Sequence, residues 1–459
     1  MDIRFSPHNS HLEDPTSFHF LDPHLRQLSR LPLVYRSELL GQLPRLIPGI
    51  YTISGGRQVG KTTLLKQWMA QLIKENIEPA RIAYLTGELI DDHHSLVRLI
   101  TDVLNDMPDM GLNFLILDEV TYIKDWDKGV KYLADAGLLE NVVFILTGSD
   151  LVIIKEARLR FPGRRGQSDR VDFFLYPLNF FECVKLKSLF TNKEMDLLLN
   201  TGEDPPSDLM SRLFSEFQNH LAHGGFLTAI NDIAREGRIL PATFSTYSDW
   251  IRGDVIKRNK KEGYLLEILE AIVKRYGSQI TWNALVRDLS IDHPKTVADY
   301  IDLLESMDAV FVQPAIREDK LAAAPKKARK VMFTDPFIFH AVNAWLNPVN
   351  DPFFQQVQPL TADSEWASRL TEACATTLYR RRFPTFYIKA MGEIDIAYIY
   401  KNRFWPVEIK WTRQIRPKQL KQIAKYPNGI ILTKLAVKGE MNGVPTEPLP
   451  LALLRLDAS

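Results

Sequence analysis

Residues 50–65 read IYTISGGRQVGKTTLL, and this stretch decides the fold of the first half of the chain. It contains the pattern G-x-x-x-x-G-K-T, which begins at Gly55 and ends at Thr62. Apolar, β-branched residues precede the pattern and a helix-compatible run follows it, which is the strand–loop–helix context that a phosphate-binding loop (P-loop) needs. The alternative, a chance glycine turn before a helix, is disfavoured because spacing and context occur together.

Such a loop predicts ATP and Mg²⁺ as cofactors. Its backbone N–H groups and the start of the following helix favour a polyphosphate. Lys61 would reach the β- and γ-phosphates, and Thr62 would hold Mg²⁺ through its hydroxyl. The predicted nucleotide-binding stretch comprises Gly55, Gly56, Arg57, Gln58, Val59, Gly60, Lys61, Thr62 and Thr63.

Two further apolar stretches end in polar residues that suit nucleotide hydrolysis. Residues 114–117 read FLIL and are followed by Asp118 and Glu119. The carboxyl ends of parallel strands are where ligands bind in open α/β sheets. Asp118 therefore fits the carboxylate on the Mg²⁺ side, and Glu119 fits the base that orients water. After the next strand, at residues 142–146, we expect Thr147 or Ser149 to contact the γ-phosphate or the water.

The basic segment 155–170 offers candidate arginine fingers. Arg164 and Arg165 could stabilise the transition state in cis or from a neighbouring subunit of a homo-oligomer, a role worth ~10³–10⁵ in rate. A solvated basic loop is the alternative, and the sequence leaves both open.

These segments together carry a family resemblance. GGRQVGKTTLLKQ, LILDEVTYIKDW, ILTGSD and PGRRG…FFLYPLNFFE resemble the AAA-type P-loop ATPases of a bacterial and archaeal family of ATP-binding proteins. The resemblance covers roughly residues 35–185. It implies a parallel α/β sheet, Walker B roles for Asp118 and Glu119, and a sensor role for Ser149. The family's Pro-Leu-x-x-Phe-x-Glu stretch departs slightly here, because Glu182 follows Phe181 directly.

The middle of the chain predicts a helical lid and then a winged helix-turn-helix over 261–330. Three apolar-faced helices precede a short strand pair, and the third helix of such a module commonly enters the DNA major groove. Basic flanks at 252–261 and 320–330 would supply phosphate contacts. The alternative is a packing or oligomerisation module. The exposed candidates on the third helix are His293, Lys295, Thr296 and Asp299.

A second group of candidate catalytic residues lies near the C-terminus. Two strands, at 391–400 and 405–411, place Asp395 on one and Glu408 and Lys410 on the other. Alternation puts Glu408 and Lys410 on one face, and a hairpin would bring Asp395 alongside. Two carboxylates and a lysine suit Mg²⁺-dependent phosphodiester hydrolysis. The alternative is an exposed salt-bridge cluster worth ~0–1 kcal/mol.

The pattern D-x₁₂-E-x-K resembles the restriction-endonuclease-like, PD-(D/E)xK, nuclease core over roughly residues 364–433. The resemblance implies an upstream carboxylate, for which Glu372 fits, and a downstream polar residue, for which Gln419 fits. Ile394 stands where the family has proline. Basic and aromatic residues crowd this region and suit nucleic-acid backbone tracking: Arg380, Arg381, Arg382, Lys389, Arg413, Arg416, Lys418, Lys421, Lys425, Tyr387, Trp405 and Trp411.

Composition bounds these hypotheses. The net charge of +1 in 459 residues excludes a global attraction to nucleic acid or membrane, so DNA binding must be local. Two distant cysteines argue against a disulfide framework. Neither a membrane-length apolar run nor a signal peptide is visible, which predicts a cytoplasmic location.

The sequence therefore predicts an α/β ATPase that binds DNA and cleaves or processes it, or alternatively a nucleotide-dependent regulatory switch with a degenerate, non-cutting tail. The expected segments are an N-terminal helical segment (1–48), an AAA-type core (49–185), a helical lid (186–260), a winged helix (261–330) and a nuclease-like domain (331–459).

Overall fold

The computed structural model describes residues 2–149, 157, 159–200, 202, 204–412 and 414–458. Arg413 and part of the basic segment 155–170 therefore lie outside the described residues. The chain forms two compact units. The first unit is Met1–Tyr176 with Ser306–Asp308, and the second is Pro177–Glu305 with Ala309–Ser459.

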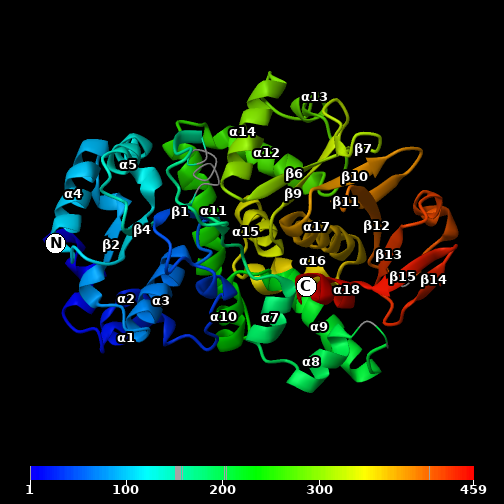
Figure 1. Ribbon diagram of the computed structural model, residues 1–459. Helices are drawn as coiled ribbons and strands as arrows, with labels where there is room; N and C mark the ends of the chain where they lie inside the picture. The colour runs from blue at the N-terminus through cyan, green and yellow to red at the C-terminus, as the bar shows by residue number, and fades with distance from the viewer. Residues whose placement is uncertain are drawn as a thin grey trace. The chain divides into compact units, whose positions relative to one another are not determined.

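The first unit is built on a five-stranded parallel sheet in the order β2-β3-β4-β1-β5 (Figure 1). One strand, β4, therefore separates the strand before the P-loop from the strand that ends in Asp118. The strands are β1 (Gly49–Ser54), β2 (Ile82–Thr86), β3 (Asn113–Asp118), β4 (Val142–Gly148) and β5 (Asp172–Phe174).

Alternation along these buried strands gives the first unit two cores. Ile116 and Tyr84 face the core that α3 (Lys61–Lys74) covers, whereas Leu115 and Leu85 face the core that α4 (His93–Asp106) and α5 (Trp126–Asp135) cover. A sheet with both faces covered is apolar throughout, and β1 to β4 are buried at every position.

The N-terminal segment packs on the α3 side of the same sheet. Phe18, Leu25 and Leu39 join the core that contains Tyr51 and Trp68. Its helices are short, because Pro23 starts a new one directly after the first ends. The remaining elements of this unit are η1 (Ile3–His8), η2 (Ser10–Leu12), α1 (Phe18–Leu21), α2 (Pro23–Leu28), η3 (Glu38–Gly41), η4 (Pro79–Arg81), η5 (Gly87–Leu89) and η6 (Val120–Tyr122).

The second unit begins with helices and carries further helices along the rest of its chain. They are α7 (Phe180–Leu186), α8 (Asn192–Leu199), α9 (Ser207–His223), α10 (Leu227–Glu236), α11 (Pro241–Lys257), α12 (Glu262–Lys274), α13 (Trp282–Val286), α14 (Pro294–Ser306), α15 (Pro336–Leu346), η7 (Phe353–Val357), α16 (Gln358–Ala362), α17 (Ser364–Arg382), η8 (Pro417–Leu420), η9 (Ile423–Lys425) and α18 (Leu449–Ala458).

Helices α12, α13 and α14 are followed by a β-hairpin, which is the order of three helices and a strand pair that the sequence predicted. In the hairpin, β6 (Val310–Pro314) pairs antiparallel with β9 (Arg329–Phe333). Between them lie the short strands β7 (Ile316–Arg317) and β8 (Ala322–Ala323). Ala315, just after β6, forms a bridge with Tyr387, so the hairpin abuts the large sheet of this unit.

That large sheet is mixed and six-stranded, in the order β10-β11-β12-β13-β15-β14 (Figure 1). Lys401 and Asn402 join β11 to β12 with φ of 49° and 57°, which is the two-residue turn that matches strand twist. The strands are β10 (Thr385–Lys389), β11 (Glu393–Tyr400), β12 (Arg403–Lys410), β13 (Ile430–Thr433), β14 (Gly439–Met441) and β15 (Val444–Pro448).

Among the described residues, none of the helices combines the length and apolarity needed to cross a membrane.

Two glycines of the second unit should respond oppositely to a methyl group. In Gly225→Ala the new Cβ would collide with the carbonyl oxygen of Leu178, and we expect a loss of about 1–3 kcal/mol in the free energy of unfolding. Gly253→Ala, inside α11, meets no atom within 4 Å and should gain about 1 kcal/mol through helix propensity. Urea unfolding followed by circular dichroism measures both. Equal stability of the two variants would contradict this packing.

Candidate functional site

The P-loop wraps the start of α3, and its conformation depends on glycine. Gly60 has a φ of 94°, which favours glycine, and a side chain at Gly55 would collide with the carbonyl oxygen of Leu175. Nζ of Lys61 donates to the carbonyl oxygens of Gly55 (3.0 Å) and Gly56 (2.9 Å). The Lys61 ammonium thus lies over the loop, at the place where a polyphosphate would accept its hydrogen bonds instead.

Asp118 is the point where four elements of the first unit meet. Its Oδ2 accepts hydrogen bonds from Oγ1 of Thr62 (2.6 Å) and from the hydroxyl of Tyr84 (2.5 Å). Its Oδ1 accepts one from Oγ1 of Thr147. Asp118 is only 2% exposed, and its donors come from α3, β2 and β4. The hydroxyl of Thr62 and the carboxylate of Asp118 are hard oxygen ligands, the kind that Mg²⁺ takes.

Glu119 is held beside Asp118 in a strained conformation. Its φ is 53°, in the left-handed region, where a non-glycine residue costs about 1–3 kcal/mol. Its N–H donates to Oγ1 of Thr147 (3.0 Å), and its Oε2 accepts from N (3.2 Å) and Oγ (3.0 Å) of Ser149. Its Oε1 lies 3.8 Å from Nζ of Lys61. The strand order explains this, because β4 carries Thr147 and Ser149 between the P-loop and the end of β3.

The candidate arginines do not join this group. Arg164 lines a pocket with Pro48 and Gly49, at the amino end of β1, whereas the P-loop follows its carboxyl end. A six-residue strand spans roughly 20 Å, so the structure does not bring Arg164 to the P-loop of its own chain, and its finger role stays a prediction. Its guanidinium is held by Asp135. Arg165 binds Asp172 (2.5 Å) and supports the β1–β5 edge.

In the second unit, Asp395, Glu408 and Lys410 lie together as the hairpin predicted. Oδ2 of Asp395 accepts a hydrogen bond from the N–H of Ile409 (2.8 Å), and Nζ of Lys410 contacts Oε1 of Glu408. Burial, with the nearby charge of Asp395, raises the pKa of Glu408 to about 8. Among the described residues, none donates a hydrogen bond to the buried Oε2 of Glu408. The exposed salt-bridge alternative therefore does not apply, because Glu408 is 4% exposed.

Sequence reasoning missed two residues of this centre, which are Glu393 on β11 and Lys330 on β9. Glu372 on α17 and Asp395 on β11 share a tight cluster with Glu393, in which one oxygen from each carboxylate lies within 4.8 Å of the others. Lys330, from β9, enters the cluster: its Nζ is 2.6 Å from Glu372 and 3.7 Å from Asp395, and it also contacts Glu393. Burial opposes the charge of Lys330, but the three carboxylates outweigh it and raise its pKa. The three carboxylates therefore surround a cation that the protein itself supplies, the ammonium of Lys330.

Several other predicted contact residues are used structurally. The ring of Tyr387 is buried and its hydroxyl donates to the carbonyl oxygen of Ala328, and Trp411 is 2% exposed, so neither presents a face to a base. Gln419, the predicted downstream polar residue, lies in the 3₁₀ turn η8, where its Oε1 accepts a hydrogen bond from the N–H of Arg416 (3.0 Å).

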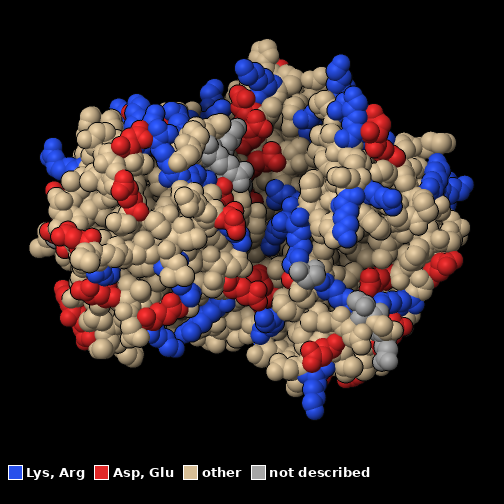
Figure 2. All heavy atoms as spheres, viewed as in Figure 1, with Lys and Arg blue, Asp and Glu red and all other residues tan. Residues whose placement is uncertain are grey.

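Basic residues remain exposed on two surfaces of the second unit. At the start of α14, His293, Lys295 and Asp299 are exposed. On the large sheet side, Figure 2 shows Lys and Arg side chains toward the right of the view, where Figure 1 draws β10 to β14, with acidic groups between them. The exposed basic residues there include Lys389, Arg416, Lys418, Lys421 and Lys425.

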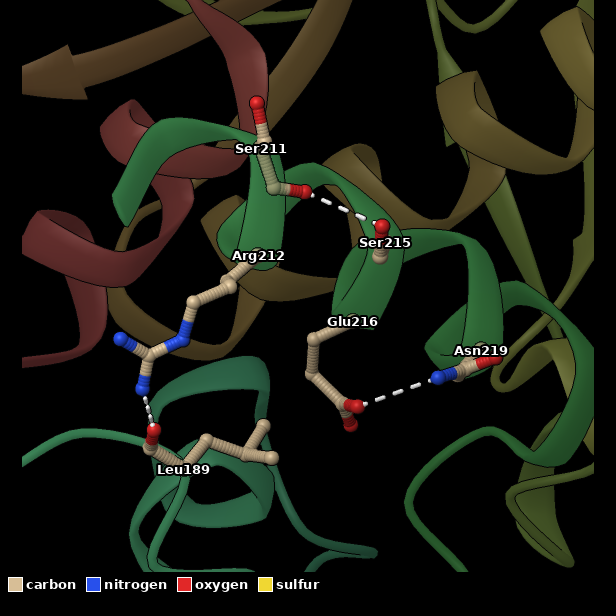
Figure 3. Close-up of a pocket in the computed structure, with 6 residues that line it drawn as sticks. All are labelled: Leu189, Ser211, Arg212, Ser215, Glu216 and Asn219. Carbon is tan, nitrogen blue, oxygen red and sulfur yellow. Dashed lines mark hydrogen bonds between the residues drawn. The ribbon is translucent and has the colours of Figure 1, made fainter. Parts of the chain in front are cut away.

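A separate pocket lies along α9 (Figure 3). Oγ of Ser215 donates to the carbonyl oxygen of Ser211 (3.0 Å), Asn219 donates to Glu216 (3.3 Å), and Arg212 binds the carbonyl oxygen of Leu189. These partners satisfy the polar groups of the pocket, and no predicted site residue lines it.

Comparison with known proteins supports the first unit most directly. A protein-family model described as an AAA domain matches residues 48–184, and one described as a domain of unknown function (DUF8612) matches residues 215–348. The match and the parallel sheet agree, so the predicted fold of this unit is confirmed: it is a P-loop domain of AAA type. The winged-helix and nuclease-like resemblances stay predictions.

Two relatives are uncharacterized proteins. One from Haemophilus influenzae is 24% identical over 270 residues, which are 56% of this chain and 60% of the relative, so this chain spans less than two thirds of its length. One from Methanocaldococcus jannaschii is 23% identical over 422 residues, or 85% of this chain and 82% of the relative.

Similar solved structures include a Walker-type ATPase of Pyrococcus abyssi, with a TM-score of 0.41, 15% identity and coverage of 64% of this chain and 91% of that one. The ORC1 protein of Aeropyrum pernix, solved in complex with DNA, has a TM-score of 0.30, 14% identity and coverage of 76% and 94%.

Removing the ammonium of Lys330 should leave the acidic cluster without its positive charge. Lys330→Met keeps most of the side-chain volume but leaves three carboxylates without their ammonium, and we expect a loss of about 3–5 kcal/mol in the free energy of unfolding. Mn²⁺ should restore part of this loss, because oxygen ligands at this spacing can take a divalent cation. Urea unfolding with and without Mn²⁺ measures both effects. The control is Lys326→Met, an exposed lysine nearby. A Lys330→Met protein as stable as wild type would contradict this description.

Proposed function

We propose that the chain hydrolyses ATP at the P-loop of its first unit. The observation that carries the proposal is the position of Glu119, whose Oε1 lies 3.8 Å from Nζ of Lys61 while Ser149 fixes the other carboxylate oxygen. A positioned carboxylate beside the phosphate-binding lysine is what a hydrolase needs and what a mere nucleotide-binding protein does not.

Each residue of the P-loop site would have its own role in ATP hydrolysis. Lys61 would exchange the carbonyl oxygens of Gly55 and Gly56 for the β- and γ-phosphates. Thr62 and Asp118 would hold Mg²⁺, which when bound neutralises charge developing on the phosphates. Glu119 would accept a hydrogen bond from the attacking water and orient it. Ser149 keeps Glu119 in place and is suited to sense the γ-phosphate.

Arg164 would act as an arginine finger toward the ATP of another subunit, which makes a homo-oligomer part of this proposal. Its position beside Pro48 and Gly49, at the amino end of β1, supports this role over one toward the P-loop of its own chain.

Variants of the P-loop test the ATPase. Lys61→Ala should abolish ATP turnover, because the phosphates lose their principal cation, and Glu119→Gln should bind ATP but hydrolyse it at least about 100-fold more slowly. Phosphate release measures turnover and a fluorescent ATP analogue measures binding. Lys74→Ala, at the exposed end of the same helix, is the matched control. Turnover that survives in Lys61→Ala would overturn the proposal.

A second candidate function is metal-dependent cleavage of DNA by the second unit. It is favoured by the buried Oε2 of Glu408, for which no described residue provides a donor, beside Asp395 and Lys410. A divalent cation would satisfy that oxygen. Asp395 and Glu408 would hold the cation, Glu372 would support it, and Lys410 would stabilise charge on the phosphate. The exposed basic residues of η8 and η9 would contact the DNA backbone.

The competing proposal is a nucleotide-dependent switch that binds DNA or protein and does not cut. It is favoured by Lys330, whose single ammonium already pairs with Glu372, Glu393 and Asp395. The two proposals differ in one measurable outcome, which is strand cleavage in the presence of a divalent metal.

Substitutions of Lys410 and Lys421 should distinguish cleavage of DNA from binding of DNA. Incubation of plasmid with the protein and Mn²⁺, with and without ATP, should yield nicked or linear products, and both Asp395→Asn and Lys410→Met should abolish them. Lys421→Met should weaken DNA binding and lower its salt dependence by about one unit of slope but cleave normally at saturating protein. If wild type leaves every DNA form intact under both Mg²⁺ and Mn²⁺, the switch is the better proposal.

A further inference from the structure

We propose that Tyr84 is a positioning residue for the Mg²⁺-side carboxylate of Asp118, and that the N-terminal segment braces it through Lys66. The inference rests on the proposed ATP hydrolysis and adds to it a part of the chain that carries no nucleotide motif. Tyr84 touches neither phosphate nor metal in this scheme, because it acts through Asp118.

The Tyr84 hydroxyl is aimed at the oxygen that matters. It donates to Oδ2 of Asp118 at 2.5 Å, the same atom that Thr62 reaches at 2.6 Å. When the hydroxyl of Thr62 turns to Mg²⁺, Tyr84 and Thr147 remain as the donors that fix the carboxylate.

A buried ammonium lies against the ring of Tyr84. Nζ of Lys66 lies 3.7 Å from the ring centroid, a cation–π contact. The same ammonium is 3.2 Å from Oδ2 of Asp22 and donates to the carbonyl oxygen of His8 (2.5 Å). The side chains of Lys66 and Asp22 are both completely buried. A pair of buried charges costs solvation energy, so its position directly against this ring points to a constraint beyond packing.

The N-terminal segment also holds the backbone of Tyr84. Nδ2 of Asn9 donates to the carbonyl oxygen of Tyr84 (2.8 Å), and the N–H of Tyr84 donates to Oδ1 of Asn9 (2.8 Å). The ring of His8 packs on the tyrosine at 5.5 Å between centroids. His8 and Asn9 thus hold the ring and the backbone of Tyr84 on the edge strand β2, and these contacts limit how far Tyr84 can move away from Asp118.

The reasoning predicts a defect in metal use. Outer partners of metal ligands typically contribute about 10–100-fold to metal affinity. Tyr84→Phe removes only the hydroxyl, so the Mg²⁺ concentration for half-maximal ATPase should rise about 10–100-fold, while saturating Mg²⁺ should restore most of kcat. Lys66→Met should shift the Mg²⁺ requirement in the same direction.

A matched tyrosine distinguishes positioning from packing. Tyr51 is buried on the same face of the sheet, but its hydroxyl donates to the carbonyl oxygen of Ile47 (2.8 Å). Tyr51→Phe should therefore keep the wild-type Mg²⁺ requirement even if it loses stability. Urea unfolding of both variants reports the structural effect separately.

Metal binding without turnover provides the second readout. Mn²⁺ affinity of the ATP-loaded Glu119→Gln protein, measured by electron paramagnetic resonance, should fall about 10–100-fold when Tyr84→Phe is added. An unchanged Mn²⁺ affinity and Mg²⁺ requirement in Tyr84→Phe would overturn the inference. If wild type binds Mn²⁺ and ATP but shows no turnover, hydrolysis fails, and the role of Tyr84 is still decided by the Mn²⁺ measurement.

Discussion

A carboxylate buried at the end of a parallel sheet needs hydrogen-bond donors. The arrangement of the helix and strands around Asp118 in the first unit supplies them. Hydroxyls from Thr62, Tyr84 and Thr147 reach its two oxygens from three different elements. These donors are neutral, and together they fix the orientation of the carboxylate. A site of this kind is preorganised for a cation, because the acidic ligand neither rotates nor needs a counterion from the protein.

The second unit meets a similar requirement by different means. Glu372, Glu393 and Asp395 are compensated by the ammonium of Lys330, which is a full charge. A divalent cation at this cluster would have to compete with a lysine that is already desolvated. Glu408 stands apart, since its Oε2 lacks a donor among the described residues. A cation held by Asp395 and Glu408, as proposed, would therefore share Asp395 with Lys330, whose Nζ lies 3.7 Å from that carboxylate.

The sequence predicted the features that local pattern controls and missed those that depend on strand order. The helix after the P-loop ends at Lys74 as expected, and Asp118, Asp395 and Glu408 lie where strand ends and alternation put them. Tyr84 escaped notice because its partner is 34 residues away and one strand over. Lys330 was counted as part of a basic flank, since nothing local shows that it points into carboxylates 42 and 65 residues downstream. The position of Arg164 at the amino end of β1 could not be predicted, because its sequence neighbours do not reveal which end of the strand it packs against.

The position of Lys330 also changes how the second unit should be divided. The hairpin of β6 and β9 stands where the sequence predicts the wing of a winged helix-turn-helix. In the structure, β9 also supplies the ammonium of the acidic cluster, and Nε2 of Gln313 on β6 donates to the carbonyl oxygens of Asp395 (2.9 Å) and Phe386 (3.1 Å). Moving the hairpin would withdraw both the ammonium and these hydrogen bonds. Any force on the hairpin, including one from bound DNA, therefore acts on the charge of the cluster. The predicted winged helix and the predicted nuclease-like domain therefore share contacts within one compact unit.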